Sequence, residues 1–242
     1  QFMLRDFGAG EATASVVRKQ LKIEPDEFDK RFLAYIEADT KHAVDNFDEW
    51  KKSLKSLVEK STARDWDAVI KEGTAIRDLY PDYVEEHSVY ETLAEAYLAK
   101  GNKAAAIAEL LRYEKIGGRE PESLKLLAKN LEEAGRAAEA AAALNRLNFV
   151  YPMDAAAHRS LGGLWLVQGN IKGAIREFAA ALARNPQDPA QAHFDLARAY
   201  HADKQTEQAK EELLAALEVA PGFRPAQKLL LELSTTEDRI KK

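Results

Sequence analysis

Hydrophobic residues recur along most of this chain with the three- and four-residue spacing of α-helices, not with the alternation of β-strands. From Leu93 onward the pattern also repeats, because leucines at 93, 127, 161 and 196 are spaced by 34, 34 and 35 residues. A small residue follows each leucine directly: Ala94, Ala128, Gly162 and Ala197. Four positions after each leucine comes a bulky residue: Tyr97, Leu131, Trp165 and Tyr200. The helical pattern is then interrupted at Gly101, Gly135, Gly169 and Lys204. Agreement in so many columns at one period predicts a structural repeat.

A second run of columns follows each break and predicts the other helix of the unit. It contains an alanine and, four residues later, a large apolar residue: Ala106 and Leu110, Ala140 and Leu144, Ala174 and Phe178, Ala209 and Leu213. The last three units close at Pro152, Pro186 and Pro221, while Gly118 takes that place in the first. Small residues let two helix backbones approach, glycine ends the first helix and proline stops the second. Asp154 and Asp188 have the character of N-caps.

These columns resemble the tetratricopeptide repeat, whose pattern is W-x₂-L-G-x₂-Y…A-x₃-F…P. The best copy here reads His158-x₂-Leu161-Gly162-x₂-Trp165…Ala174-x₃-Phe178…Pro186. The resemblance implies an all-α fold, a right-handed α-solenoid of helix–turn–helix repeats. The four repeats are expected at residues 87–120, 121–154, 155–189 and 190–223.

The segments beside the four repeats also have helical patterns. Residues 46–86 resemble a degenerate repeat, with helices at 48–61 and 64–80 closed by Pro81. Residues 224–242 predict a capping helix from Arg224 to Ile240, with leucines 229, 230 and 233 facing inward.

Residues 1–45 do not fit the repeat. Short helices are expected at 2–7 and 11–21, and Pro25 begins a stripe that predicts one long helix or two with a bend near 39–42. The stretch LRDFGAGEATASVVRKQLKIEPDEFDKRFLAYIE is similar to the end of gluzincin-type zinc metallopeptidase domains. That resemblance implies a catalytic domain before Gln1, with this chain as a C-terminal fragment, since the family's H-E-x-x-H motif is absent from it.

Composition and charge narrow the function classes. Hydrophobic residues make up 46% and charged residues 31% of the 242 residues, which is typical of a globular chain. The net charge of −5 argues against nucleic acid as a partner, and no apolar run reaches the ~20 residues of a membrane span. Without cysteine there is no disulfide or thiolate site, but the compartment, cytoplasm or cell envelope, stays open.

Candidate chemistry is sparse, so no cofactor, metal or catalytic residue is predicted and the chain is not expected to be an enzyme. His158 and His193 occupy the same repeat column as Tyr90 and Leu124, which favours a packing role over metal ligation. The glycine pairs lack the strand, loop and lysine of a phosphate-binding loop.

What remains is the groove that the first helices of such a solenoid line. A helical-wheel projection places ten candidate binding residues there: Glu91, Glu95, Lys125, Lys129, Glu132, Arg159, Leu166, Phe194, Arg198 and His201. The same charges could equally be an ordinary solvated face. The positions of a carboxylate clamp for chaperone tails do not match, which disfavours that ligand.

The first hypothesis is an interaction scaffold that binds a peptide or protein in this groove. The alternative is an accessory C-terminal region of a zinc metallopeptidase.

Overall fold

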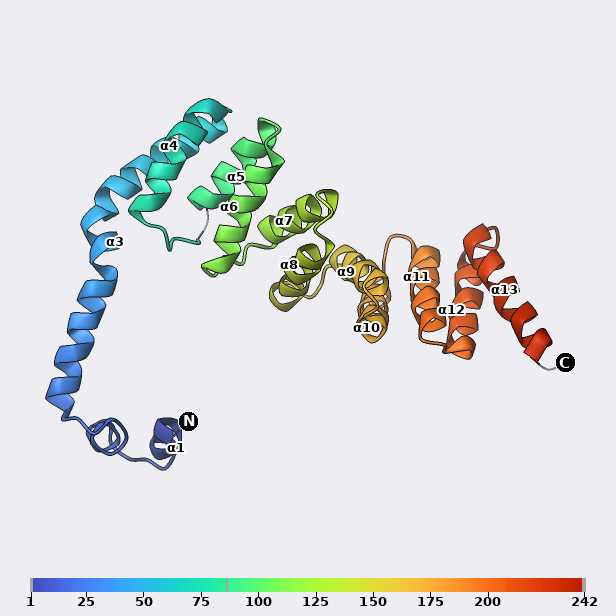
Figure 1. The fold of residues 1–242 in the computed structure, drawn as a ribbon, viewed down its shortest axis with the longest axis horizontal. Coiled ribbons are helices and arrows are strands. Elements are labelled where there is room, and N and C mark those ends of the chain that lie inside the picture. Colours follow the sequence, from blue (N-terminus) through green and yellow to red (C-terminus); the bar gives the residue numbers. More distant parts are fainter. Residues whose placement is uncertain (1, 86, 241–242) are drawn as a thin grey trace. The chain divides into compact units, whose positions relative to one another are not determined.

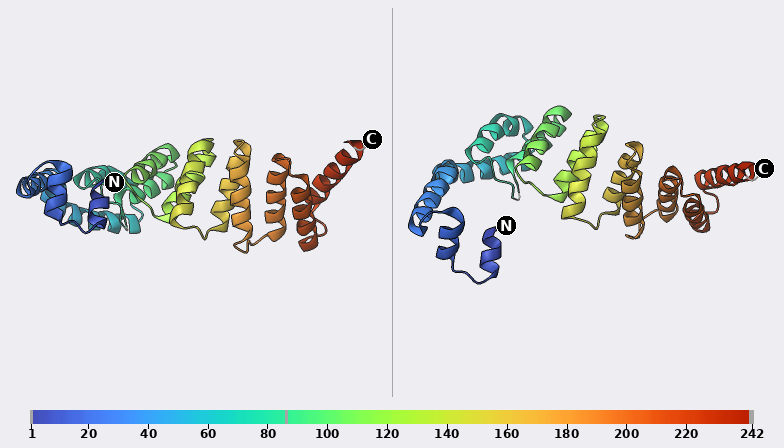
Figure 2. Two further views of the ribbon diagram at one scale, coloured as in Figure 1. Left: turned by 90° about the horizontal axis from the view of Figure 1, so that it is seen from below. Right: turned by 60° about the horizontal axis from the view of Figure 1, so that its bottom comes forward.

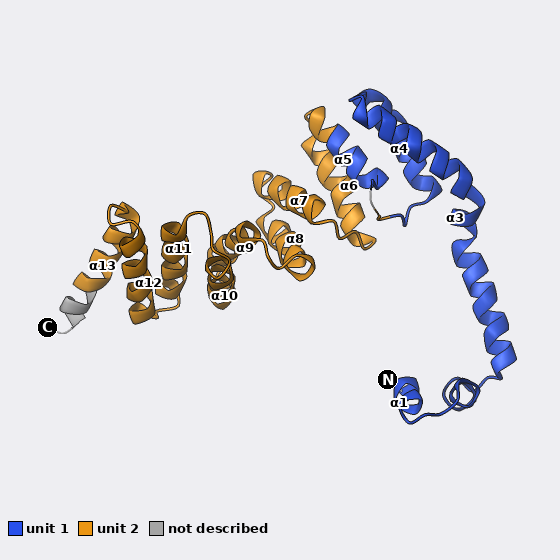
Figure 3. Cartoon of the chain, turned by 180° about the vertical axis from the view of Figure 1, so that it is seen from behind, with its two compact units in different colours: residues 1–83, 87–96 blue, residues 84–86, 97–242 orange. Residues whose placement is uncertain are grey.

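The computed structural model describes residues 2–85 and 87–240, with side chains described as far as residue 235. Throughout these residues the secondary structure is helical and no strand occurs, which confirms the all-α class. The chain divides into two compact units (Figure 3). Unit 1 comprises residues 1–83 and 87–96, and unit 2 comprises residues 84–86 and 97–242. Each unit is described by itself below.

Unit 1 contains the N-terminal helices and is dominated by one long helix. Its elements are α1 (Phe2–Gly8), α2 (Thr13–Val16), the π-helical η1 (Val17–Leu21), α3 (Pro25–Thr62), α4 (Trp66–Leu79) and most of α5 (Val89–Ala99). Of the two sequence alternatives for α3, the single 38-residue helix is the one observed. The predicted border between residues 45 and 46 therefore falls inside a continuous helix. The reason is local, because neither glycine nor proline occurs from residue 26 to residue 72.

The C-terminal half of α3 packs against α4. Trp50 and Leu57 on α3 are buried, as are Val69 and Ile76 on α4. The ring of Trp50 also meets those of Tyr80 and others in an aromatic cluster, with 5.2 Å between the Trp50 and Tyr80 centroids. The predicted helices at 48–61 and 64–80 thus correspond to the C-terminal part of α3 and to the whole of α4.

Unit 2 is a stack of antiparallel helix pairs (Figures 1 and 2). Its helices are α6 (Lys103–Lys115), α7 (Pro121–Glu133), α8 (Ala137–Val150), α9 (Ala155–Val167), α10 (Ile171–Leu182), α11 (Pro189–Ala202), α12 (Thr206–Val219) and α13 (Arg224–Ile240). The pairs α7–α8 and α9–α10 lie within the predicted repeats 121–154 and 155–189, and α11–α12 occupies the fourth, 190–223, except that α11 begins one residue earlier. Each pair contacts the next. Helix α13 packs on α12 and has the bounds predicted from the sequence.

The breaks between paired helices have the backbone conformation that the repeat columns predict. Gly101, Gly135 and Gly169 have φ values of 75°, 72° and 80°. Lys204, the fourth member of the column, adopts the same left-handed region with φ 61°, although it carries a side chain. Both predicted N-caps are confirmed as well, since carboxylate oxygens of Asp154 and Asp188 accept hydrogen bonds from backbone N–H groups three residues later.

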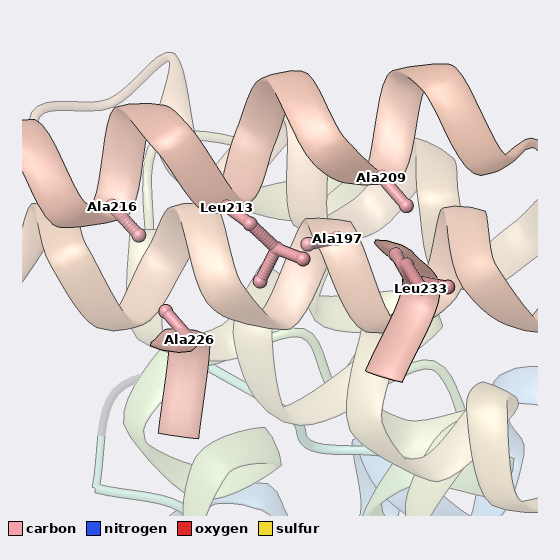
Figure 4. Close-up of a cluster of buried hydrophobic side chains, with 6 residues drawn as sticks. All are labelled: Ala197, Ala209, Leu213, Ala216, Ala226 and Leu233. Carbon is pink, nitrogen blue, oxygen red and sulfur yellow. The ribbon is translucent and has the colours of Figure 1, made fainter. Parts of the chain in front are cut away.

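Small residues lie where the paired helices cross. In the last repeat Leu213 of α12 points towards Ala197 of α11, within a buried cluster that α13 completes with Ala226 and Leu233 (Figure 4). In the third repeat the same two columns hold Gly162 and Phe178. A Cβ atom on Gly162 would lie 2.8 Å from Cδ1 of the Phe178 ring. The larger Phe178 side chain therefore fits because Gly162 lacks the methyl group that alanine has at this position in the neighbouring repeats.

We expect Gly162→Ala to destabilise the protein even though alanine is the better helix former. The gain in helix propensity is at most about 1 kcal/mol, and overpacking a buried crossing costs about 1–3 kcal/mol. Adding Phe178→Leu recreates the alanine–leucine pair of the neighbouring repeats and should restore stability. Urea unfolding of both single variants and of the double variant measures this coupling. Equal free energies of unfolding for Gly162→Ala with and without Phe178→Leu would contradict it.

Candidate ligand-binding groove

Two hollows lie on the face of unit 2 that the first helices of the repeats and α13 share. The α7–α9 pocket has a volume of about 420 Å³ and is lined by Lys125, Ala128, Lys129, Glu132, Glu133, Leu144, Asp154, Ala156, Ala157 and Ser160. The α9–α13 pocket has a volume of about 620 Å³ and is lined by Leu166, Val167, Phe194, Arg198, His201, Ala202, Pro225, Lys228, Leu229 and Glu232. Second helices contribute only Leu144 to these two linings.

The groove residues predicted from the sequence are distributed among several hollows. Lys125, Lys129 and Glu132 line the α7–α9 pocket. Four others line the α9–α13 pocket, namely Leu166, Phe194, Arg198 and His201. Arg159 lines a third hollow of about 550 Å³ beside the loops that precede α9 and α11. Eight of the ten predicted residues thus line hollows of unit 2, but they do not form one shared site.

Glu91 and Glu95 belong to the part of α5 in unit 1, so they are not placed relative to these pockets. Glu91 also has a structural role that the projection missed. Its carboxylate accepts a hydrogen bond from the backbone N–H of Ser88, while the Ser88 hydroxyl accepts one from the N–H of Glu91. This reciprocal pair is a capping box, and the S-x-x-E pattern from Ser88 to Glu91 was the sequence signal for it.

Lys125 is bound to its own chain more firmly than a free groove cation would be. Its ammonium group lies 2.7 Å from a carboxylate oxygen of Asp154 and 2.9 Å from one of Glu122. Hydrogen bonds to these two carboxylates raise the pKa of Lys125 above its usual range. Reversing the charge at Lys125 would remove both ion pairs and place a third carboxylate beside those of Asp154 and Glu122, so this substitution should lower stability.

Asp154 joins two functions, since it is both the N-cap of α9 and the partner of Lys125 on α7. Burial by itself raises the pKa of Asp154, but the Lys125 ammonium and the backbone N–H of Ala157 together hold it below its ordinary value. A carboxyl group with a lowered pKa in the folded state stabilises the fold above its unfolded pKa, near 4, and loses that contribution as the pH falls through the folded value.

We expect Asp154→Ala to lower the free energy of unfolding by about 1 kcal/mol at neutral pH, the usual cost of a lost N-cap, plus any contribution of the Lys125 pair. Asp154→Asn keeps a capping oxygen and should lose only the ion pair. The gap between wild type and Asp154→Asn should close as the pH is lowered below about 4. Urea unfolding at several pH values measures it, and a gap that stays constant down to that range would exclude the assigned role of the carboxylate.

A second ion pair joins α9 to α11. Asp195 is buried, and its carboxylate accepts hydrogen bonds from Nε of Arg159 at 2.7 Å and from the Gln191 side chain at 2.9 Å. The guanidinium of Arg198 lies 3.8 Å from Oδ1 of Asp195, the oxygen that Gln191 also contacts. The spacing along α11 puts Gln191, Asp195 and Arg198 on one face of that helix. The contact between Asp195 and Arg159, by contrast, joins α11 to α9 of the preceding repeat. Arg159 is thus partly committed to holding two first helices together.

The α7–α9 pocket keeps a mixture of charges. Lys129 makes no ion pair with any described residue. The pKa of Glu133 is lowered chiefly by its hydrogen bond with Lys103, and the charge of Lys129 adds to this effect. Burial in the hollow raises the pKa of Glu132. Lysines 125 and 129 therefore face three carboxylates, those of Glu132, Glu133 and Asp154, so this pocket has no strong preference for either charge.

The α9–α13 pocket is apolar with a basic rim. Six of its residues are apolar, namely Leu166, Val167, Phe194, Ala202, Pro225 and Leu229. Phe194 is fixed by an edge-on contact with Phe223, with 5.5 Å between ring centroids. The guanidinium of Arg198 lies over the Phe194 ring. Lys228, on the α13 side of this pocket, was not among the groove residues predicted from the sequence.

The histidine column has the packing role that the sequence predicts. Nδ1 of His158 lies 2.7 Å from a carboxylate oxygen of Glu177, and Nδ1 of His193 lies at the same distance from Glu212, 19 residues on in both repeats. Among the described residues no group of three or more His, Asp or Glu could hold a metal ion. Within that same part of the chain, no helix has both the length and the apolarity needed to cross a bilayer.

Comparisons with known proteins recognise the repeat. Two tetratricopeptide repeat family models match residues 125–189 and 166–233. A structure described as YrrB, a TPR protein with an unusual peptide-binding site, superposes with a TM-score of 0.57 at 18% identity, covering 73% of this chain and 89% of that one. MamA from Desulfovibrio magneticus RS-1 superposes with a TM-score of 0.53 at 23% identity over 62% of this chain and 84% of that one. The C-terminal part of a TPR repeat-containing protein from Cytophaga hutchinsonii superposes with a TM-score of 0.53 at 14% identity. That superposition covers 78% of this chain and 73% of the other.

These similarities establish the fold, a solenoid of tetratricopeptide repeats. Among curated proteins no match was found. Both family models begin after residue 124, so the resemblance of residues 1–45 to a metallopeptidase domain gains no support from them.

Proposed function

We propose that this chain is a protein-interaction scaffold that binds a peptide or an extended segment of a partner protein along the first-helix face of unit 2. The observation that carries the proposal is the position of the two pockets, which both lie on that face. Pockets for ligands are typically concave and combine apolar walls with a few placed polar groups. The resemblance of the fold to a repeat protein with a peptide-binding site, as that structure is described, supports the same function.

The side chains of the face divide into structural and available groups. Lys125 and Arg159 hold neighbouring helices through Asp154 and Asp195. Lys129 and Lys228 are both exposed. Lys129 makes no ion pair with a described residue, and Lys228 makes only a long contact with Glu232, at 4.0 Å. An exposed pair of this kind contributes little to stability. These two lysines are therefore free to meet a ligand without cost to the fold.

Selection of random peptides displayed on phage against the whole chain tests the proposal, followed by photo-crosslinking of the selected peptides. We expect crosslinks on α7, α9, α11 or α13. The double charge reversal Lys129→Glu with Lys228→Glu should weaken binding at least tenfold. A matched double reversal on second helices, Lys115→Glu with Lys172→Glu, should leave it unchanged. Failure to select any peptide, or crosslinks confined to α8, α10 and α12, would refute the function.

The metallopeptidase alternative concerns a domain before Gln1 and stays a prediction from the resemblance alone. It does not compete with the scaffold function for the residues of unit 2, since it assigns no chemistry to them.

A further inference from the structure

The α9–α13 pocket differs from the rest of the groove in its apolar lining and in the charges of its rim. Val167, the last residue of α9, has a relative exposure of 86% although its side chain is apolar. It lies at the edge of the hollow that Leu166, Phe194 and Leu229 also line. Leu166, Phe194 and Leu229 are themselves only partly buried. Apolar side chains left accessible together in a concave site, unlike scattered ones, indicate an apolar ligand.

The charged side chains that line this pocket comprise two cations and one carboxylate. Arg198 and Lys228 line it together with the imidazole of His201, and Glu232 is the single carboxylate of the lining. The buried carboxylate of Asp195, the other acidic group near Arg198, is already bonded to Arg159 and Gln191. Lys228 and Glu232 are highly exposed and 4.0 Å apart, so a ligand carboxylate can replace the contact. The rim therefore complements negative charge.

The floor of the pocket is held in place before any ligand arrives. Phe194 packs edge-on against Phe223, and both belong with Leu229 to the residues that surround the buried cluster of α11, α12 and α13 (Figure 4). A fixed aromatic ring loses little conformational entropy when a ligand side chain covers it. A volume of about 620 Å³ accommodates one bulky side chain and the backbone beside it.

Resting on the proposed function, we infer that the α9–α13 pocket binds an acidic peptide segment through one bulky apolar side chain flanked by aspartate or glutamate. The apolar side chain lies against Val167, Phe194 and Leu229, and the flanking carboxylates face Arg198 and Lys228. This pocket thereby sets the sequence preference of the groove. The α7–α9 pocket, with its mixed charges, contributes contacts of lower selectivity.

The probe is a nine-residue peptide with blocked ends and a central leucine between two aspartates on each side. Its binding to the whole chain is measured by isothermal titration calorimetry. Replacing the leucine by serine, or the aspartates by lysines, should each weaken binding at least tenfold. Raising the salt concentration should also weaken it, because the charges of the rim are exposed.

Two valine variants provide a matched comparison. Val167→Asp places a carboxylate at the pocket edge and should weaken binding of the leucine peptide at least tenfold. Val219→Asp is the control, since Val219 is likewise the last residue of its helix, α12, and is 53% exposed, but it lies outside the pocket. Circular dichroism tests whether both variants retain the helical fold.

The outcomes separate this inference from the function on which it rests. If the serine peptide binds as well as the leucine peptide, or if Val167→Asp binds like wild type, the assigned ligand is wrong. If library peptides crosslink to α7 and are insensitive to Val167→Asp, the inference fails while the scaffold function stands. If neither library nor designed peptides bind, both fail.

Discussion

His158→Leu should lower the free energy of unfolding by about 2–3 kcal/mol, because it removes one partner of a buried, hydrogen-bonded pair. The Glu177 carboxylate is then left with Asn148 and the exposed Arg176 side chain as its partners. His158 and Glu177 are both buried. Nδ1 of the histidine lies 2.7 Å from the Glu177 carboxylate, and Nε2 lies 3.1 Å from the backbone oxygen of Pro152. The side-chain amide of Asn148 donates to the same carboxylate at 2.9 Å. This network joins α8, α9 and α10.

The neighbouring repeats supply the controls for this variant. His193 and Glu212 form the same pair one repeat later, but both side chains are partly exposed, so His193→Leu should cost no more than about 1 kcal/mol. One repeat earlier the two positions hold Leu124 and Ala143, both buried. The double variant His158→Leu with Glu177→Ala recreates that apolar pair and should recover at least half of the loss.

Urea unfolding followed by circular dichroism measures the free energies of wild type, both single variants His158→Leu and Glu177→Ala, their double variant, and the control His193→Leu. The coupling between positions 158 and 177 should be large and favourable in the wild type. If His158→Leu and His193→Leu cost the same, burial does not determine the strength of the pair and our explanation is wrong.

The repeat columns predicted the helices well because each column follows from a local or short-range requirement. A residue with positive φ must end the first helix, and small residues must lie at the crossing, so the pattern alone indicates the pairs α7–α8, α9–α10 and α11–α12. The bounds of α13 follow from Pro221 and Gly222 before it and a continuous leucine stripe. The long α3 was undecided only because polar residues near 39–42 interrupt its apolar stripe without breaking the helix.

The candidate site was harder to predict, because its chemistry depends on contacts between repeats. The helical wheel indicates that Lys125 and Arg159 lie on the groove face, but not that each is bound by a carboxylate on the next first helix. Those partners, Asp154 and Asp195, are 29 and 36 residues away. Which of several charges pair depends on the rise and rotation between repeats. The basic α13 side of the α9–α13 pocket was missed for the same reason.

Ala174→Phe should cost on the order of 1–3 kcal/mol, because Ala174 is fully buried among Phe178, Leu196 and Ala199. These residues come from α10 and α11, so a larger side chain must push apart two consecutive repeats as well as the helices of one. Trp165 and Tyr200 also border the cluster and leave little freedom for rearrangement.

The matched control is Ala142→Phe, at an exposed position inside α8. Both substitutions lose the same helix propensity, about 0.5 kcal/mol, so the difference between them isolates packing. Thermal unfolding compares the two variants with wild type. Equal melting temperatures for Ala174→Phe and Ala142→Phe would mean that the alanine column does not mark the crossing, and the packing scheme inferred for all the repeats would have to be withdrawn.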